Sequence, residues 1–477
     1  MSVGRISLSL ALAGALVACG GGGGSGGNTG GGGGSTPTPT SGTPTPSVCS
    51  LADRQAWVLQ QLERDYLFPS LLDTGVDPAA YATVQEYIDA LVAPARALGR
   101  DRYFTYITSI QQEQDLINSG SSAGFGVRLA YDSVNSRVFI LEAFESGPAF
   151  GQGIDRGTEI IAVDGTSTAD LFAAGGAAAF SDALGPTEAG VTRTLIIRQP
   201  DSTQSSVTVT KADYVLDPVS DRYGAVVIPN TDGRNVGYIN LRTFIVADAG
   251  PQLRTAIDGF RQQGIEQVIL DFRYNGGGLV SVAELLGDLL GADKVGQQFS
   301  RTEFNSILGP ANNSSKNFAA QPEAIAATKI ALIGTGSTAS ASELTGNAFI
   351  PYLGSDLALV GSNTYGKPVG QIARDRSACD DRLRVMAFRT VNADGGGDYY
   401  TGLASVMPRT CAATDDYLDQ FGTTGEASTA AALSFLSGGS CTAISAAGTQ
   451  RPLARQRTQP LRPAAPTAAQ YQIPGLY

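Results

Sequence analysis

Ser340 and Lys367 are the residues of this sequence best placed to carry out covalent and proton-transfer chemistry. Ser340 lies in IALIGTGSTASASEL, residues 330–344, where a glycine-rich turn precedes a helical pattern. Lys367 lies in GSNTYGKPVGQ, residues 361–371, and is one of five lysines. The chain of 477 residues contains no histidine, so a nucleophilic serine needs another base. A neutral lysine amine is the obvious candidate.

For Lys367 to act as a base, burial must lower its pKa from about 10.4 by roughly three units. A nearby carboxylate would oppose that shift. The uncharged amide of Gln371 would instead orient the amine without holding its extra proton. The ordinary alternatives are that Ser340 is a helix N-cap and Lys367 a solvated surface lysine. Ser342, two residues into the predicted helix, should point away from the turn.

A second glycine-rich turn lies in VILDFRYNGGGL, residues 268–279. It follows one predicted strand and opens a predicted helix, as the serine turn does. Sites in α/β layers lie at the carboxyl ends of strands, and free N–H groups at helix starts suit a developing oxyanion. The two turns are therefore expected to meet at one edge of a sheet.

The elements that must position these turns alternate between strand and helix over residues 213–445, which predicts an α/β layer with parallel strands. The predicted strands are 236–241, 267–272, 329–333 and 357–360, and the predicted helices are 251–263, 279–290 and 340–350. Residues 49–118 read as an N-terminal helical region, with apolar residues at helical spacing in 56–66 and 84–98.

Residues 120–212 are rich in short β patterns, including 138–141 and 159–163. This region resembles a PDZ domain of the bacterial type in two ordered segments, GFGV at 124–127 and ESGPAFGQGIDRGTEIIAVDG at 145–165. The resemblance implies that a loop of four residues binds a peptide end, which then adds as a strand. Those residues are Gly124, Phe125, Gly126 and Val127. The alternative is a generic small β domain with turn glycines.

Three segments together resemble the carboxyl-terminal processing peptidases, also called tail-specific proteases. They are DFRYNGGG at 271–278, TASASE at 338–343, and TYGK at 364–367 followed by Gln371. The resemblance implies a crotonase/ClpP-like peptidase core behind the PDZ domain. It makes Ser340 the nucleophile, Lys367 the general base and Gln371 its orienting partner, with an oxyanion hole from the backbone N–H groups of Gly277 and Ala341.

The function implied by the resemblance is a serine endopeptidase that hydrolyses peptide bonds in exported proteins and recognises their C-termini through the PDZ domain. Its partners would be unstructured protein or peptide C-termini, and it would need no cofactor or metal. The alternative from another class is a non-catalytic PDZ-type peptide-binding lipoprotein. The net charge of −11 disfavours a nucleic-acid partner, and the oligomeric state stays open.

The first residues resemble a targeting signal. An apolar run at 6–17, too short to span a bilayer, predicts a signal peptide over residues 1–18. Small residues before Cys19 resemble a bacterial lipobox, so Cys19 is the predicted lipidation site. A Gly/Thr/Pro-rich linker follows at 19–48. These features predict an exported protein, lipid-anchored to a bacterial membrane on the periplasmic or cell-surface side. An ordinary signal peptide is the alternative.

Export leaves four cysteines in an oxidising compartment, and three pairings are possible. The favoured pairs are Cys379–Cys411, which flank one polar segment, and Cys49–Cys441, which would tie the ends of the folded body. Free thiols are the alternative. Residues 446–477 are predicted to be a disordered tail. Its hydrophobic last residues are nevertheless the type of ligand that a PDZ groove accepts.

The sequence around the lysines disfavours two other enzyme classes. Gly361, Gly366 and Lys367 match a phosphate-binding loop up to its last position, where Pro368 replaces the hydroxyl that would bind magnesium. A penicillin-recognising Ser-Lys enzyme needs Ser-x-x-Lys, and none of the five lysines lies in that pattern.

Overall fold

The computed structural model describes residues 48–444 and 458–477. The predicted signal peptide 1–18, Cys19 and nearly all of the linker 19–48 lie outside these residues. Among the helices that are described, none is both long and apolar enough to cross a bilayer.

A six-stranded sheet carries the residues singled out for chemistry. Its strand order is β10-β11-β12-β15-β16-β19. Every neighbouring pair is parallel except β10 with β11. The strands are β10 (Ala225–Pro229), β11 (Asn235–Asn240), β12 (Gln267–Asp271), β15 (Lys329–Gly334), β16 (Leu357–Gly361) and β19 (Arg409–Ala412).

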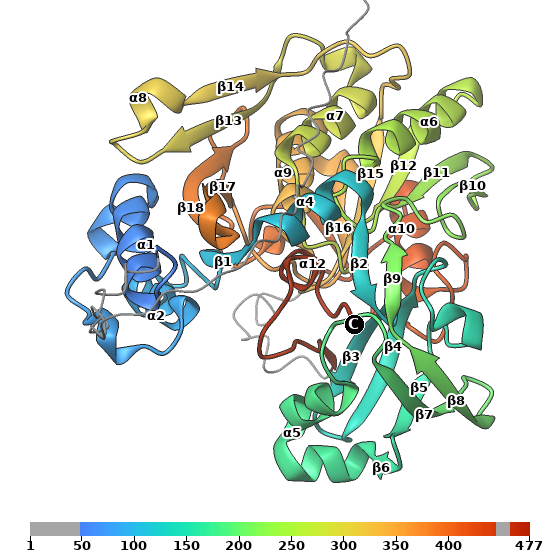
Figure 1. The fold of residues 1–477 in the computed structure, drawn as a ribbon. Coiled ribbons are helices and arrows are strands. Elements are labelled where there is room, and N and C mark those ends of the chain that lie inside the picture. Colours follow the sequence, from blue (N-terminus) through green and yellow to red (C-terminus); the bar gives the residue numbers. More distant parts are fainter. Residues whose placement is uncertain (1–47, 445–457) are drawn as a thin grey trace, which may run out of the picture. The chain divides into compact units, whose positions relative to one another are not determined.

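Helices cover both faces of this sheet. Successive strand residues point to opposite sides, so the buried side chains of each strand pack against helices on both faces. In β15, Ile330 and Leu332 face a core shared with α6, α7 and α9, whereas Ala331 and Ile333 face α10 (Figure 1). The helices are α6 (Ala249–Gln262), α7 (Val280–Leu290), α9 (Ala341–Leu353) and α10 (Ala427–Leu436). This three-layer arrangement confirms the predicted α/β fold class, and the predicted strands and helices agree within about three residues.

The region predicted as a PDZ domain contributes six strands to a seven-stranded sheet of order β20-β3-β4-β5-β7-β8, in which β6 also pairs with β5 and β20 comes from residues 458–460. Helix α5 packs on it through Phe180 and Leu184. Its elements are β3 (Val127–Asp132), β4 (Arg137–Ala143), β5 (Glu159–Val163), β6 (Thr166–Ser167), α5 (Thr168–Leu184), β7 (Thr192–Arg198), β8 (Gln204–Thr210) and β20 (Thr458–Pro460). A separate pair, β2 (Ser121–Gly124) and β9 (Ala212–Val215), adjoins it in sequence.

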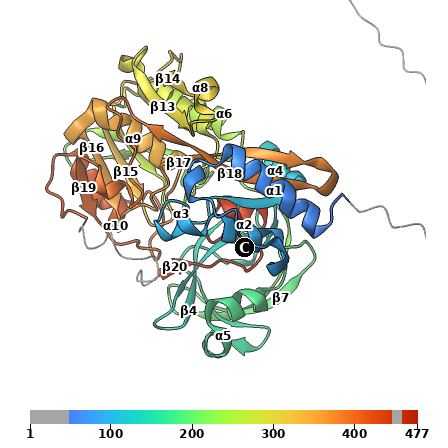
Figure 2. The same cartoon turned by 90° about the vertical axis from the view of Figure 1, so that its left-hand side faces the viewer.

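The N-terminal region contains the predicted helices but also a strand that the helical pattern missed. Its elements are α1 (Leu51–Asp65), α2 (Val84–Leu91), α3 (Ala93–Ala97), β1 (Tyr106–Ser109) and α4 (Ile110–Ser119). Strand β1 pairs with β18 in a five-stranded sheet, and α1 contacts the same strand (Figure 2). The other strands are β13 (Gln298–Phe304), β14 (Ser314–Asn317), β17 (Val369–Arg376) and β18 (Asp381–Val391), and α8 (Gly309–Asn312) joins β13 to β14.

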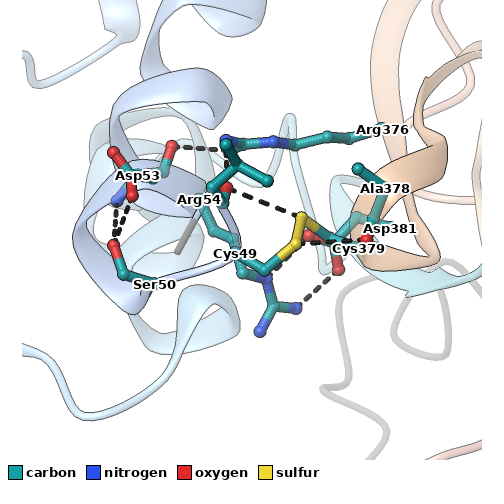
Figure 3. Close-up of a disulfide and its surroundings, with 9 residues drawn as sticks. Cys49, Ser50, Asp53, Arg54, Arg376, Ala378, Cys379 and Asp381 are labelled. Carbon is teal, nitrogen blue, oxygen red and sulfur yellow. Dashed lines mark hydrogen bonds and ion pairs between the residues drawn. A yellow bond between two sulfur atoms is a disulfide. The ribbon is translucent and has the colours of Figure 1, made fainter. Parts of the chain in front are cut away.

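The predicted disulfide pairing is wrong. The structure joins Cys49 to Cys379 and Cys411 to Cys441. Cys379 lies at the tip of the β17–β18 hairpin, beside the start of α1, where Arg54 forms a bidentate ion pair with Asp381 (Figure 3).

Cys411, by contrast, lies in β19 of the other sheet. Because the segment between Cys379 and Cys411 runs from one sheet to the other, these two cysteines cannot meet. Each cysteine of the second disulfide is followed by a residue that joins the same contact: Ala412 N donates to the carbonyl of Thr442.

The prediction of a disordered tail over 446–477 is wrong for its last twenty residues. Residues 458–460 form β20, which pairs antiparallel with β3, and Ala468–Gln472 form α12. Residues 445–457 lie outside the described part of the chain. The prediction of disorder rested on the composition of the tail alone. Composition carries no information about α4 and β3, against which these residues pack.

Candidate active site

Three turns meet at the carboxyl edge of the six-stranded sheet, as predicted. They follow β12, β15 and β16, which are neighbours in parallel register. The first turn contains Gly277, the second ends at Ser340 where α9 begins, and the third contains Lys367. This edge is where α/β layers place their sites.

Ser340 occupies a sharp turn between β15 and α9. Its φ of 57° and ψ of −116° lie in a region that non-glycine residues rarely adopt, so the turn stores strain. Gly277 packs directly against it: a Cβ atom there would lie 2.7 Å from Ser340 Cβ and 2.9 Å from Ala341 N. Only glycine fits at this position, and its φ of +103° also favours glycine.

A buried carboxylate links the serine turn to the lysine turn. Glu343 Oε2 accepts hydrogen bonds from Ser340 N (3.0 Å) and Lys367 N (2.7 Å). Its Oε1 accepts from Gly366 N (2.7 Å) and Thr364 Oγ1 (2.5 Å). Burial raises the pKa of Glu343, and the four donors oppose that shift. Glu343 is therefore a positioning residue that holds the backbones of Ser340 and Lys367 on one oxygen atom.

The predicted pairing of Lys367 with Gln371 is present. Lys367 Nζ donates to Gln371 Oε1 at 3.0 Å, and Gln371 Nε2 donates in turn to the carbonyl of Phe104. Because the amide nitrogen is committed to that carbonyl, the amide oxygen must face the amine. The Phe104 ring centroid lies 5.0 Å from Nζ. Phe104 thus fixes Gln371, although no motif in the N-terminal region pointed to it.

The electrostatics at Lys367 agree with the sequence expectation in direction. Loss of solvent around the amine lowers the pKa of Lys367 to about 8, and Arg384 adds to that shift. Asp101 and Glu343 act in the opposite sense. A substantial fraction of the amine is therefore neutral at mildly alkaline pH and can accept a proton.

Lys367 lines a cavity whose wall also includes Ala339, the residue before Ser340. Within 48–444 and 458–477, no hydrogen bond joins Ser340 Oγ to Lys367 Nζ. Catalytic hydrogen bonds often tighten only when substrate is bound. A cavity of about 310 Å³ lies beside Lys367, and residues from the serine turn and the first glycine turn line it. These residues are Gly276, Gly336, Ser337 and Ala339.

The two predicted oxyanion donors differ in their present bonding. No partner for the Ala341 N–H is found among the described residues. The Gly277 N–H donates to Asn275 Oδ1 at 2.9 Å, so it is engaged in this structure. Asn275 also accepts at its carbonyl from Ala339 N and Ser342 Oγ, and its Nδ2 donates to Leu241 O. Ser342 thus faces the glycine turn and secures it.

The arginine of the DFRYNGGG segment is structural. Arg273 forms hydrogen-bonded ion pairs with Asp271 and Glu426, and all three side chains are fully buried. Burial of Glu426 opposes its ionisation, but the bonds and charge of Arg273 outweigh that and lower its pKa to about 2. Glu426 also accepts from the N–H groups of Ser428 and Thr429 at the start of α10. Arg273 therefore fastens the glycine turn to α10.

The four predicted peptide-binding residues connect β2 to β3. Gly124 and Gly126 have positive φ, and the side chain of Phe125 is buried in the core of the seven-stranded sheet. Gly126 packs against Gly147: a Cβ atom on Gly126 would lie 2.4 Å from Gly147 Cα. A side chain at position 147 would clash in the same way, because a Cβ atom there would lie 2.6 Å from Gly126 Cα. No cluster of three or more metal-ligating side chains occurs in the described ranges.

Residues 235–401 match the model of peptidase family S41. A carboxyl-terminal-processing protease of Picosynechococcus sp. is 26% identical over 297 residues, which cover 60% of this chain and 63% of that protein. The carboxy-terminal processing protease CtpA of Bacillus subtilis is 24% identical over 365 residues, which cover 75% of this chain and 68% of that protein. The similarity to carboxyl-terminal processing peptidases predicted from the three segments is confirmed. The match nevertheless spans less than two thirds of the Picosynechococcus relative's own length.

Among solved structures, a putative S41 protease from Bacteroides fragilis superposes with a TM-score of 0.61. The superposition covers 80% of this chain and 97% of that one, at 24% sequence identity. It supports the fold described above.

Proposed function

We propose that this chain, whose residues 235–401 match the model of peptidase family S41, is a serine endopeptidase of the tail-specific type. Ser340 would be the nucleophile, Lys367 the general base and Gln371 the residue that orients the amine. The observation that carries this proposal is the pair of bonds from Gln371, one accepted from Lys367 and one donated to Phe104. They aim an amine of lowered pKa beside the turn that holds Ser340.

The proposed reaction begins when neutral Lys367 takes the hydroxyl proton of Ser340 as the oxygen attacks the scissile carbonyl. The N–H of Ala341 stabilises the oxyanion, and the N–H of Gly277 joins it after release from Asn275. Lys367 then gives its proton to the leaving amine, which departs and leaves an acyl-enzyme. Water attacks the ester as Lys367 takes one of its protons. Lys367 then gives that proton to Ser340 Oγ as the ester bond breaks, which releases the acid product and restores the hydroxyl and the neutral amine.

Recognition of substrate C-termini belongs to the same proposal. Residues 120–212 would act as a PDZ domain, in which the loop Gly124–Val127 and the edge of β3 hold a peptide as an added strand. Such a peptide would be an unstructured end of an exported protein. The two disulfides support an oxidising compartment. Lipid attachment at Cys19 stays a prediction, and metabolic labelling with palmitate, compared with Cys19→Ala, would test it.

The proposal is tested by casein cleavage with Ser340→Ala and Ser342→Ala side by side. Both serines lie near the same turn, so Ser342→Ala controls for local damage. We expect Ser340→Ala to lose cleavage by at least about a thousandfold. Ser342→Ala should lose much less, because its hydroxyl bonds the backbone of Asn275 and not the substrate. Full activity in Ser340→Ala would leave only the peptide-binding role.

A further inference from the structure

The outer edge of β3 is occupied by the chain's own residues 458–477. One pass of this segment is β20, which pairs with residues 130–132, and Leu461 N then donates to Leu129 O at 3.0 Å. The second pass lies antiparallel to residues 127–129. Here Leu129 N donates to Gly475 O at 2.7 Å, Val127 N donates to Tyr477 O at 3.1 Å, and Tyr477 N donates to Val127 O at 2.9 Å.

Helix α12 (Ala468–Gln472) lies between these two passes. Together they use the main-chain groups of β3 that a peptide ligand would need. The edge of β3 proposed to bind a peptide is therefore occupied by residues of the same chain.

The side chain of Tyr477 fills a closed pocket next to this edge. It is 2% exposed and packs in the same core as Phe125, Phe180 and Leu184. Its phenol oxygen lies 2.7 Å from Ser181 Oγ, so the buried hydroxyl has a partner. At the other side, a Cβ atom on Gly124 would lie 2.8 Å from the carbonyl carbon of Tyr477. The pocket thus accommodates an aromatic ring that carries a hydroxyl, and glycine at 124 leaves room for its backbone.

The same segment crosses the catalytic turns before it reaches the pocket. The carbonyl of Gln472 packs on Gly276, where a Cβ atom would lie 2.4 Å from that oxygen. Tyr471 stacks on Tyr106 with ring centroids 4.0 Å apart. Pro474 and Gly475 line the cavity that also contains Lys367. A substrate strand entering that cavity would have to displace these residues.

We propose that the groove beside β3 binds extended polypeptide segments that place a tyrosine ring in the pocket beside Ser181, and that residues 473–477 are its resident occupant. A substrate end competes with this occupant and moves it away from Gly276 when it binds. Binding to the groove stands on the contacts above, whereas the effect on cleavage rests on the proposed peptidase function.

The size of the competition follows from the tether. A segment tethered by a short linker has an effective concentration of about 1 mM. If the resident segment itself binds the groove with a Kd of about 100 μM, roughly one groove in ten is open. Removal of the occupant should therefore tighten apparent binding of an outside peptide by about tenfold.

The test uses the full chain with Ser340→Ala, which prevents cleavage, and a fluorescent Ile-Pro-Gly-Leu-Tyr peptide with a free carboxyl group. Tyr477→Asp places a charge in the apolar pocket, and Ala465→Asp adds the same charge at an exposed position of the same segment. We expect Tyr477→Asp, and Tyr477→Ala as a charge-free version, to bind the peptide about tenfold more tightly than the parent. Ala465→Asp should behave as the parent does.

Equal peptide affinity in the parent and both Tyr477 variants would overturn the proposal. A second measurement needs no substitution at Tyr477. In the parent chain, excess peptide should speed removal of residues 475–477 by an added carboxypeptidase severalfold, and an unchanged rate would also count against resident occupancy.

The preference for tyrosine is tested with peptides that end in Tyr or Phe, against Tyr477→Asp with and without Ser181→Ala. Loss of the buried hydrogen bond should cost the Tyr peptide about three- to tenfold in affinity, and Ser181→Ala should abolish the difference between the two peptides. Equal affinity for both peptides when Ser181 is present would refute the tyrosine preference.

Cleavage is measured separately with Ser340 intact. Tyr477→Asp should cleave casein about tenfold faster than Ala465→Asp. If no variant cleaves casein while peptide binding responds as expected, the proposed peptidase function fails and the resident occupant stands. If all variants cleave equally and none changes in peptide affinity, the occupant is refuted and the peptidase function stands.

Discussion

Two lysines in different regions of the molecule have the same lowered pKa. Burial lowers the pKa of Lys367, in the turn after β16, to about 8. Burial likewise lowers the pKa of Lys211, which follows β8 in the seven-stranded sheet, to about 8, with a smaller contribution from Arg193. Each amine also lies near a phenylalanine ring, Phe104 for one and Phe125 for the other.

Their hydrogen bonds and surroundings differ. Lys211 Nζ donates to the carbonyls of Gly185 (2.9 Å) and Pro186 (2.7 Å), so the amine closes a turn. Among the residues that the structure describes, Lys367 Nζ donates one hydrogen bond, to an amide that is itself fixed, and it borders a cavity. A lowered pKa marks a candidate site but does not identify the base. The free direction of the amine at Lys367 distinguishes it.

The largest effect is expected when each of the two lysines is replaced in turn. Lys367→Met should lower kcat/KM for a peptide substrate by about a thousandfold, because the general base is lost. Lys211→Met removes an amine of equal pKa from the other region and should keep activity within about threefold. Initial rates of both variants at one pH test this, and equal losses would mean that the two amines cannot be ranked by geometry.

A smaller effect is expected when the partner of Lys367 becomes charged. Gln371→Glu places a carboxylate next to the amine and should raise its pKa by about one to three units. Activity at pH 7.5 should fall by about ten- to several hundredfold and recover as pH rises. Gln371→Met, which loses the bond without adding charge, should lose activity with little change in the shape of the pH profile.

The unsubstituted protein should show the titration of Lys367 itself. Because the neutral amine is the reactive form, kcat/KM should rise with pH and level off above about 8. Between pH 7 and pH 9 the increase should be about tenfold. Lys211→Met should leave this profile in place, and a profile that moves with Lys211 would assign the titration to the wrong region.

The smallest effect concerns stability. The pKa of Lys211 is lower in the folded chain, at about 8, than in the unfolded chain, at about 10.4. The unfolded chain therefore binds more protons between these values, and the free energy of unfolding should rise with pH across that window. Lys211→Met should reduce that slope by at most about 1.4 kcal/mol per pH unit, measured by denaturant unfolding at several pH values.

The sequence predicted those parts of the site that depend on local pattern. Alternation of apolar runs located β12, β15 and β16, and the glycine turns after them placed Gly277 near Ser340. The four-residue separation of Lys367 and Gln371 predicted their contact, because both lie where the chain enters β17.

Contacts between distant segments were beyond local pattern. Phe104 lies over two hundred residues before Gln371, and a lone phenylalanine carries no signal of such a role. The disulfides were mispaired for the same reason, since spacing does not reveal that the β17–β18 hairpin turns toward α1. The order of residues 458–477 was missed because composition describes a segment without its neighbours.

The positions of Phe104 and Glu426 bear on where a working unit of this molecule begins and ends. Residues 235–401 contain the serine, the lysine and the glutamine, yet the carbonyl that aims Gln371 precedes that stretch and the carboxylate that fastens Arg273 follows it. An excised fragment with those boundaries would contain every reactive group but would lack the Phe104 carbonyl and the Glu426 carboxylate that position them. The smallest portion worth transplanting into another protein therefore extends from the N-terminal helices through α10.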